Sequence, residues 1–272
     1  MLRLHFEHTL QRGTYTLNMK YKGELSDNLR GFFVSHYEDG NNQVPFLATH
    51  FQKTTARQAF PCWDEPALKA TFNISLKHFD KYTALSNMPV SEVEYDATDG
   101  KYWTRFETTP VMSTNILAFV ISDFEHISNS NGTMNVWANK HAITNVDYFM
   151  MVIEKAAMAL TEYLNSTVRV PKMDHVIFPH YSARATENWG LITYMDYAVP
   201  RDTESQYGGH RAANVMTVTH ELSHQWFGNL VSPSWWTYFW MSEGMATYLK
   251  ILITDRFFKD WRLMDSIIHE QR

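Results

Sequence analysis

The sequence predicts an α+β protein in which an antiparallel β domain precedes a domain of helices and short strands. Through about residue 124, short runs of apolar residues alternate with polar ones, which is typical of strands with one buried face. Beyond that point, apolar residues recur every three or four positions, as in helices packed on a core. We therefore divide the chain into residues 1–124 and 125–272.

In the first part, the alternation predicts strands near residues 2–6, 15–21 and 72–76, and the apolar run 116–124 predicts a buried strand. Turn residues cluster at 39–42 and at 99–100. In the second part, we expect a strand at 134–138, a helix at about 146–164, and short strands at 176–178 and 191–194. Helices are expected from about residue 209 onward. Phe258, Trp261, Met264 and Ile268 predict one face of a last helix, and because it carries no capping signal we expect a truncated chain.

The composition limits which classes of function and which partners fit this chain. The net charge is −5 and no basic stretch of five residues occurs, which argues against nucleic acid and against an anionic membrane as partners. Cys62 is the one cysteine, so no internal disulfide forms. Sequons at Asn73, Asn131 and Asn165 are a weak sign of a secreted or lumenal chain. No run approaches the roughly 20 apolar residues of a membrane helix, so any membrane anchor lies outside this chain.

The strongest functional signal is the segment His220-Glu221-Leu222-Ser223-His224. On a helix, two histidines four residues apart project from one face and can reach one tetrahedral zinc ion. Glu221 follows the first histidine, where it can lean toward a zinc-bound water without being a ligand. The alternative is a solvated helix that happens to carry two histidines.

A third ligand is available at Glu243, after a loop at Ser232-Pro233-Ser234 that would let a second helix return beside the first. Two histidines and one carboxylate leave a fourth position open for water, which is the arrangement of a catalytic zinc site. One Zn²⁺ per chain is expected.

Three segments together resemble the zinc aminopeptidases of the aminopeptidase N type, which have a thermolysin-like catalytic domain. They are residues 56–66 (ARQAFPCWDEP), residues 185–194 (ATENWGLITY) and the zinc segment through Glu243. The resemblance spans essentially the whole chain. It implies an incomplete N-terminal β-sandwich-like domain followed by a C-terminally truncated, thermolysin-like mixed α/β peptidase domain.

The resemblance also implies residue roles. His220, His224 and Glu243 would bind zinc, Glu221 would be the general base, and Glu187 would bind the free α-ammonium of a peptide substrate. Ala185 and Asn188, which belong to the same exopeptidase motif as Glu187, would contact the substrate too. The implied activity is removal of single residues from peptides with a free N-terminus.

The chain departs from this family at three positions. Arg184 and Thr186 stand where the exopeptidase motif has Gly and Met, so Arg184 could narrow the cleft, favour acidic peptides or pair with a carboxylate. His50 stands where the family has a Gln that helps to hold the ammonium. We expect neutral His50 to accept the same hydrogen bond, so that activity falls at mildly acidic pH. The family's oxyanion-stabilising tyrosine would lie beyond Arg272.

These departures leave an alternative function open: a catalytically impaired zinc-binding relative that acts as a cell-surface binding or receptor protein. The retained set of His220, Glu221, His224, Glu243 and Glu187 favours the enzyme. Glu187-Asn188 argues against an endopeptidase. Because the family that the chain resembles is usually found at the cell surface, we expect an extracellular or cell-surface location, although intracellular relatives exist.

Overall fold

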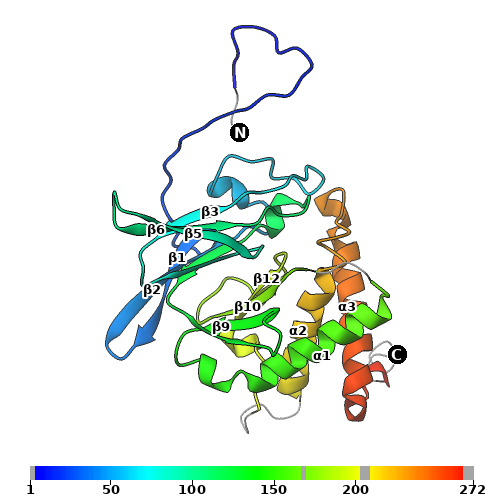
Figure 1. Cartoon of the computed structure of the whole chain (residues 1–272). Helices are drawn as coiled ribbons and strands as arrows, with labels where there is room; N and C mark the ends of the chain where they lie inside the picture. Colours follow the sequence, from blue (N-terminus) through cyan, green and yellow to red (C-terminus); the bar gives the residue numbers. More distant parts are fainter. Residues whose placement is uncertain (1–3, 167–169, 203–208, 266–272) are drawn as a thin grey trace.

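The computed structural model describes residues 4–166, 170–202 and 209–265. Three sheets and three long helices make up this part of the chain (Figure 1). The last strand of the first two sheets ends at Ser122, and the third sheet begins at Glu125. The predicted order, antiparallel sheets followed by a mixed domain, is confirmed.

The two N-terminal sheets are antiparallel throughout. The first has the order β1-β2-β7-β4 and the second the order β3-β6-β5. Their strands are β1 (Gly31–Asp39), β2 (Asn42–His50), β3 (Ser75–His78), β4 (Thr83–Ser86), β5 (Val90–Asp96), β6 (Lys101–Phe106) and β7 (Phe119–Ser122). The predicted turns at 39–42 and 99–100 join β1 to β2 and β5 to β6.

The third sheet is mixed and has the order β11-β12-β10-β9-β8. Its three central strands run parallel, and the two outer strands are antiparallel to their neighbours. The strands are β8 (Glu125–Ser128), β9 (Met134–Ala138), β10 (Met173–Phe178), β11 (Ala185–Thr186) and β12 (Leu191–Met195). Because β11 ends the order, one edge of this two-residue strand faces away from the sheet.

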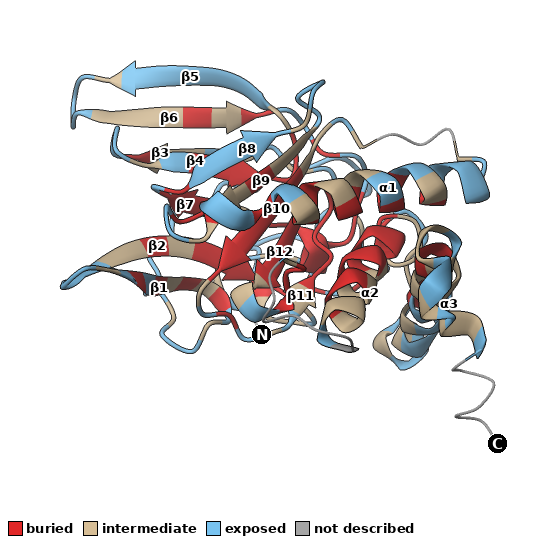
Figure 2. Ribbon diagram, turned by 90° about the horizontal axis from the view of Figure 1, so that it is seen from below, coloured by how far each residue is buried: buried red, intermediate tan, exposed pale blue. Residues whose placement is uncertain are grey.

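Helices α1 (Asp147–Tyr163), α2 (Gly209–His224) and α3 (Phe239–Phe257) pack beside the third sheet (Figure 1). Val215, Val218 and Leu222 of α2 are fully buried at helical spacing, and they join one core with residues of α1, α3, β10 and β12. Figure 2 shows most of α2 and the central strands as buried. The short 3₁₀ segments are Ala56–Gln58, Thr114–Ile116, Ile143–Asn145, Asp196–Ala198, Trp236–Tyr238 and Lys259–Trp261.

The two halves of the chain also share a core. Phe46 and Phe124 from the N-terminal half pack with Phe178 and Leu191 of the third sheet. The rings of Phe46 and Phe178 stack with centroids 5.1 Å apart. The boundary at residue 124 remains a prediction, because burial is continuous across it.

Several sequence predictions differ from the structure. The strands predicted near 2–6 and 15–21 are wrong over the described residues: residues 4–25 contain no strand, and Leu2 lies outside the described part. An alternating pattern makes a strand only where a neighbouring chain supplies hydrogen bonds and a surface to cover the apolar face. Here Tyr15 and Tyr21 are 56% and 60% exposed.

Other predictions were too broad. The run 116–124 starts at the last residue of a 3₁₀ turn, Thr114–Ile116, and only its four residues Phe119–Ser122 form a strand, β7. The last predicted helix is interrupted, because α3 ends at Phe257 and Arg262 adopts a left-handed conformation. Phe258 and Trp261 stack on each other across this break, and Ile268 lies outside the described residues.

Candidate active site

The three predicted metal ligands converge. His220 and His224 project from one face of α2, and Glu243 comes from the first turns of α3. One ligand atom from each residue lies within 4.8 Å of the others. The two Nε2 atoms are 3.1 Å apart, and the carboxylate oxygens of Glu243 lie 3.4 Å from His220 Nε2 and 3.5 Å from His224 Nε2.

The sequence explains why α3 returns to this place. After His224 the chain makes a bridge between Phe227 and Val231, followed by the predicted loop and the 3₁₀ turn Trp236–Tyr238. Gly228 has φ +137°, and a Cβ there would lie 3.0 Å from the ring of His224. His224 Nδ1 lies 2.8 Å from the carbonyl oxygen of Phe227. If Nδ1 carries the ring proton and donates it to this carbonyl in a hydrogen bond, Nε2 is unprotonated. Its lone pair then faces the other two ligands.

Glu221 is buried beside this cluster and is 6% exposed. Burial raises the pKa of its carboxyl well above the ordinary value, and the negative charges of Glu187 and Glu243 raise it further, while Lys250 opposes the rise. Burial also lowers the pKa of His220. Burial raises the pKa of Glu243, but the hydrogen bond to His220 and nearby positive charges bring it below its ordinary value. Glu221 is thus within electrostatic range of two other carboxylates, those of Glu187 and Glu243.

Glu187 lies directly after the edge strand β11 and is 5% exposed. Its Oε1 accepts a hydrogen bond of 2.8 Å from Gln52 Nε2. Its backbone oxygen accepts hydrogen bonds from Asn229 Nδ2 (2.7 Å) and Gln225 Nε2 (3.2 Å), which both follow the metal helix. We call these two residues the Glu187 clamp. The clamp links the backbone at Glu187 directly to the end of the helix that carries His220 and His224.

The turn after Glu187 is fixed as well. Gln225 Oε1 accepts a hydrogen bond of 3.1 Å from the backbone N–H of Gly190. Gly190 has φ +67°, and a Cβ there would lie 2.7 Å from the carbonyl oxygen of Asn87. Only glycine fits such a position without a backbone shift. Asn188 is buried in this turn, and its side-chain amide has no hydrogen-bond partner among the described residues.

The other sequence-predicted residues are placed as follows. Ala185 pairs with Tyr194 across β11 and β12, next to Glu187. The ring of His50 contacts Ser182 and Tyr181 instead of Glu187: its Nδ1 lies 2.6 Å from Ser182 Oγ. Gln52, two residues later, donates a hydrogen bond to Glu187, and the expected contact of His50 with a substrate ammonium stays a prediction. Burial lowers the pKa of His50 to about 4.

Sequence reasoning missed Gln52, Gln225 and Asn229. A weak indication of Gln225 and Asn229 was present in the sequence, because polar amides that follow a helix with an apolar face need hydrogen-bond partners if they are buried. Gln52 carried none, since it lies 135 residues from Glu187 in sequence.

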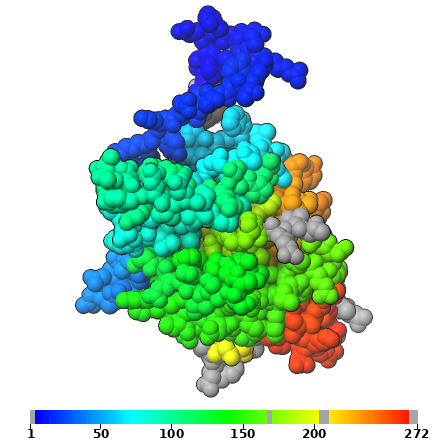
Figure 3. All heavy atoms as spheres, in the orientation of Figure 1, coloured from blue at the N-terminus to red at the C-terminus, as the bar shows by residue number. Residues whose placement is uncertain are grey.

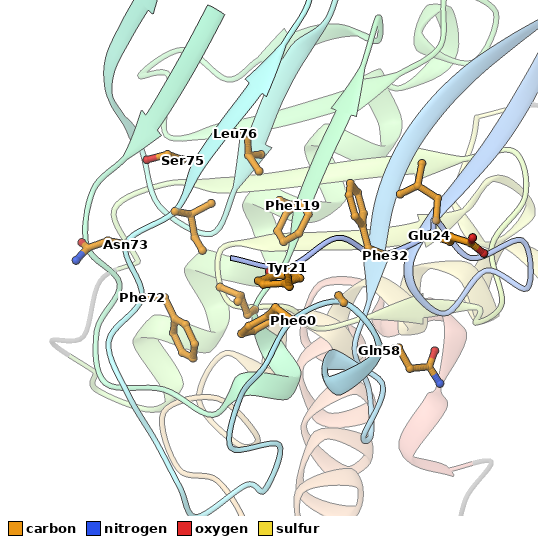
Figure 4. Close-up of a pocket in the computed structure, with 15 residues that line it drawn as sticks. Tyr21, Glu24, Phe32, Gln58, Phe60, Phe72, Asn73, Ser75, Leu76 and Phe119 are labelled. Atoms are coloured by element: carbon orange, nitrogen blue, oxygen red, sulfur yellow. The ribbon is translucent and has the colours of Figure 1, made fainter. Parts of the chain in front are cut away.

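A separate pocket of about 540 Å³ lies away from this site, between residues 21–25 and the two N-terminal sheets (Figure 4). Tyr21, Phe32, Phe60, Phe72 and Phe119 line it with mostly apolar surface, and Glu24 and Gln58 lie at its margin. The only His/Cys/Asp/Glu group among the described residues that could hold a metal ion is the one at His220. No helix in the described part of the chain is long and apolar enough to cross a membrane.

Comparison with known proteins identifies two matching domains. Residues 1–116 match the peptidase M1 N-terminal domain, and residues 148–272 match the peptidase family M1 domain. The chain is 39% identical to aminopeptidase N of Bos taurus, covering 98% of this chain and 28% of that protein. It is 38% identical to aminopeptidase Ey of Gallus gallus (95% of this chain, 27% of that protein) and 34% identical to aminopeptidase M1-A of Oryza sativa subsp. japonica (99% and 31%).

These matches extend over both halves of the chain, although the chain spans less than a third of the length of each of these relatives. The two matched domains occur in the order that the fold shows, with the converging His220, His224 and Glu243 inside the second. The chain therefore belongs to peptidase family M1.

Proposed function

We propose that the full-length protein is a zinc-dependent aminopeptidase that hydrolyses the first peptide bond of peptides with a free N-terminus. The observation that carries this proposal is the convergence of His220, His224 and Glu243 on one point, with buried Glu221 next to it. The negative charge of Glu187 acts on Glu221, which supports a role for Glu187 at the same site.

The donor set fits zinc. In a tetrahedral site with metal–ligand bonds near 2.0–2.1 Å, neighbouring ligand atoms lie about 3.3 Å apart. The two Nε2 atoms, 3.1 Å apart, are near this value, and each lies 3.4 or 3.5 Å from one of the two carboxylate oxygens of Glu243. The two imidazole Nε2 atoms face each other, and a carboxylate lies beside both. This arrangement suits a cation bound by all three groups better than a single hydrogen bond between the imidazoles.

Glu221 is suited to be the general base. Zinc, when bound, would act as a Lewis acid and lower the pKa of its water to about 7. A carboxylate whose pKa is raised above its ordinary value, as for Glu221, accepts a proton more readily than an ordinary one. In this environment Glu221 would take the proton of the attacking water and return it to the leaving amine.

Glu187 would set the position of the substrate. Its carboxylate can pair with the α-ammonium, while Gln52 holds one of its oxygens in place. The Glu187 clamp fixes the backbone at this residue relative to the metal helix. An ammonium bound here would bring the first peptide bond, and no later one, to the metal site.

An alternative is a catalytically impaired zinc-binding relative that acts as a cell-surface binding or receptor protein. Arg184, which stands in place of a small residue beside α2, motivates it. Glu221 and Glu187 weigh against it, because metal binding alone requires neither of them.

The proposed location is extracellular or at the cell surface, with any anchor outside this chain. Exposure of the three sequon asparagines, Asn73, Asn131 and Asn165, supports this proposal, since glycosylation requires an accessible side chain. Enzymatic deglycosylation of the expressed full-length protein tests it through a change in mass.

The deciding experiment is hydrolysis of a panel of aminoacyl-arylamides by the full-length protein, with and without a chelator. We expect chelator-sensitive release that disappears when the α-amine of the substrate is acetylated. Glu187→Ala should raise KM, whereas Glu92→Gln, on the exposed strand β5, should leave turnover unchanged. If no aminoacyl-arylamide were cleaved in a chelator-sensitive manner, the receptor alternative would replace the enzyme.

A further inference from the structure

Arg184 is held in a defined place beside the metal helix. Its Nε donates a hydrogen bond of 2.8 Å to Thr217 Oγ1, and its Nη2 donates one of 2.6 Å to Asn214 Oδ1. Both acceptors belong to α2, and Asn214 is itself fixed by the carbonyl oxygens of Tyr197 and Val199. A guanidinium has five N–H groups, so these two bonds leave three for another acceptor. The side chain is exposed to solvent.

This position is close to the reacting groups. Asn214, Thr217 and Glu221 follow the i, i+3, i+7 spacing and therefore share one face of α2. Residues three or four apart on a helix have Cβ atoms about 5–6 Å apart. The guanidinium, anchored at Thr217, thus lies about one helical turn from His220 and Glu221.

A second cation comes from α3. Lys250 lies two helical turns after Glu243, so both residues project from the same side of that helix. The positive charge of Lys250 interacts with His220, Glu221 and Glu243. It also interacts with the positive charge of Arg184. Because the charge of Lys53 also acts on Glu243, three carboxylates and three cations share this site.

The edge strand gives the substrate a direction. β11 has one unpaired edge, along which an extended peptide can add as a further strand. A peptide whose ammonium lies at Glu187 and which runs antiparallel to β11 passes Thr186 and Ala185 and then reaches Arg184. At about 3.3 Å per residue, the three positions from Glu187 to Arg184 span about 10 Å. The third or fourth residue of the peptide would then lie beside Arg184.

We infer that Arg184, supported by Lys250, is a specificity-determining residue that favours peptides with a carboxylate at the third or fourth position. That carboxylate is either an acidic side chain or the C-terminus of a short peptide. The inference rests on the proposed aminopeptidase function and specifies its substrate class. Arg184 forms charge-assisted hydrogen bonds with the carboxylate through its free N–H groups, and Lys250 adds to the positive field.

The test uses the full-length protein and peptides that share one N-terminal residue. One series carries Glu, Gln or Lys at position three or four in a long peptide, and a second compares tripeptide and tetrapeptide acids with the corresponding amides. We expect kcat/KM to be about tenfold higher for Glu than for Gln, mostly through KM, because a hydrogen bond to a charged group contributes about that much. The first series reports an acidic side chain, and the second reports a terminal carboxylate.

Arg184→Gln should abolish the preference and leave kcat/KM for the Gln peptide within about threefold, and Arg184→Lys should keep part of it. Arg105→Gln, on β6 and paired with Glu92 and Glu94, is the matched control and should keep it all. Equal kcat/KM for charged and neutral peptides in both wild-type series would overturn the inference, and this comparison needs no variant. A preference that survives in Arg184→Gln would also overturn it. Failure to cleave any peptide would refute the aminopeptidase proposal itself.

Discussion

The metal helix α2 and the N-terminal segment 4–25 differ in how their sequence patterns relate to structure. In α2, buried polar residues such as Glu221 and His224 lie among apolar side chains that pack on the core. In residues 4–25, alternating apolar side chains are exposed, and the segment projects from the body of the molecule (Figure 3). The spacing of residues in a helix fixes which side chains share a face, because the hydrogen bonds of the helix are local. An alternating sequence forms a strand only where a neighbouring strand supplies its hydrogen bonds.

If this comparison is correct, the largest effect on turnover should come from Glu221. Glu221→Gln keeps the size of the side chain but removes the proton acceptor, so kcat should fall by about 10³-fold. Steady-state kinetics on an aminoacyl-arylamide measures the loss, and metal analysis of the same variant should show unchanged metal content. Turnover within a few fold of wild type would assign the base to another group.

The Glu187 clamp should give the next largest effect. Asn229→Ala leaves a buried carbonyl with one hydrogen bond fewer, which typically costs about 1–3 kcal/mol. We expect a lower melting temperature and a KM for N-terminal substrates about tenfold higher. Differential scanning fluorimetry and kinetics measure the two effects, and Asn41→Ala, in the exposed β1–β2 turn, is the control. An unchanged KM would show that the clamp does not position Glu187.

His50 should affect stability rather than catalysis. Its pKa is lowered by burial to about 4, below its ordinary value near 6.5, so it stays neutral in the folded protein at mildly acidic pH. Its contribution to stability is fully present above pH 6.5 and is lost as pH falls toward 4, because the unfolded chain takes up the proton first. We expect the loss to be about 1–3 kcal/mol.

The test compares His50→Gln with wild type at several pH values. The gap in melting temperature between the two proteins should narrow as pH falls from 7 to 4.5. Their pH–rate profiles between pH 5 and 8 should coincide, contrary to the initial expectation for His50. A variant that remains active at lower pH than wild type would restore that expectation.

The smallest effect should come from the N-terminal segment. In this structure Tyr15 and Met19 are 56% and 42% exposed, so Tyr15→Ser and Met19→Ser should each change stability by less than about 0.5 kcal/mol. Chemical denaturation of the 272-residue chain measures this, with the core substitution Val218→Ala as a contrasting control. A loss of 2 kcal/mol or more would mean that the alternating residues are packed as a strand in solution.

The same contrast explains what the sequence could predict. The helical spacing of Phe149, Ile153 and Leu160 predicted α1 nearly to its ends, and the four-residue spacing of His220 and His224 predicted one side of the metal cluster. The hairpin strands β1 and β2 were missed, although the turn between them was recognised. Their buried positions include Ser35 and Thr49, which weaken the apolar alternation.

Contacts between distant segments could not be predicted. Gln52 reaches Glu187 only because β2 and the turn after β11 are brought together by the shared core of the two halves. Nor does a local pattern reveal that Arg184 lies against Asn214 and Thr217, some 30 residues later. Such contacts depend on the assembled fold, and in this molecule they complete the site.

The central claim is that His220, His224 and Glu243 bind one zinc ion, and calorimetric titration of Zn²⁺ into the metal-free full-length protein tests it most directly. The account predicts one equivalent bound, with affinity at least 100-fold weaker in Glu243→Ala and unchanged in Glu92→Gln. Equal zinc affinity in wild type and Glu243→Ala would contradict it.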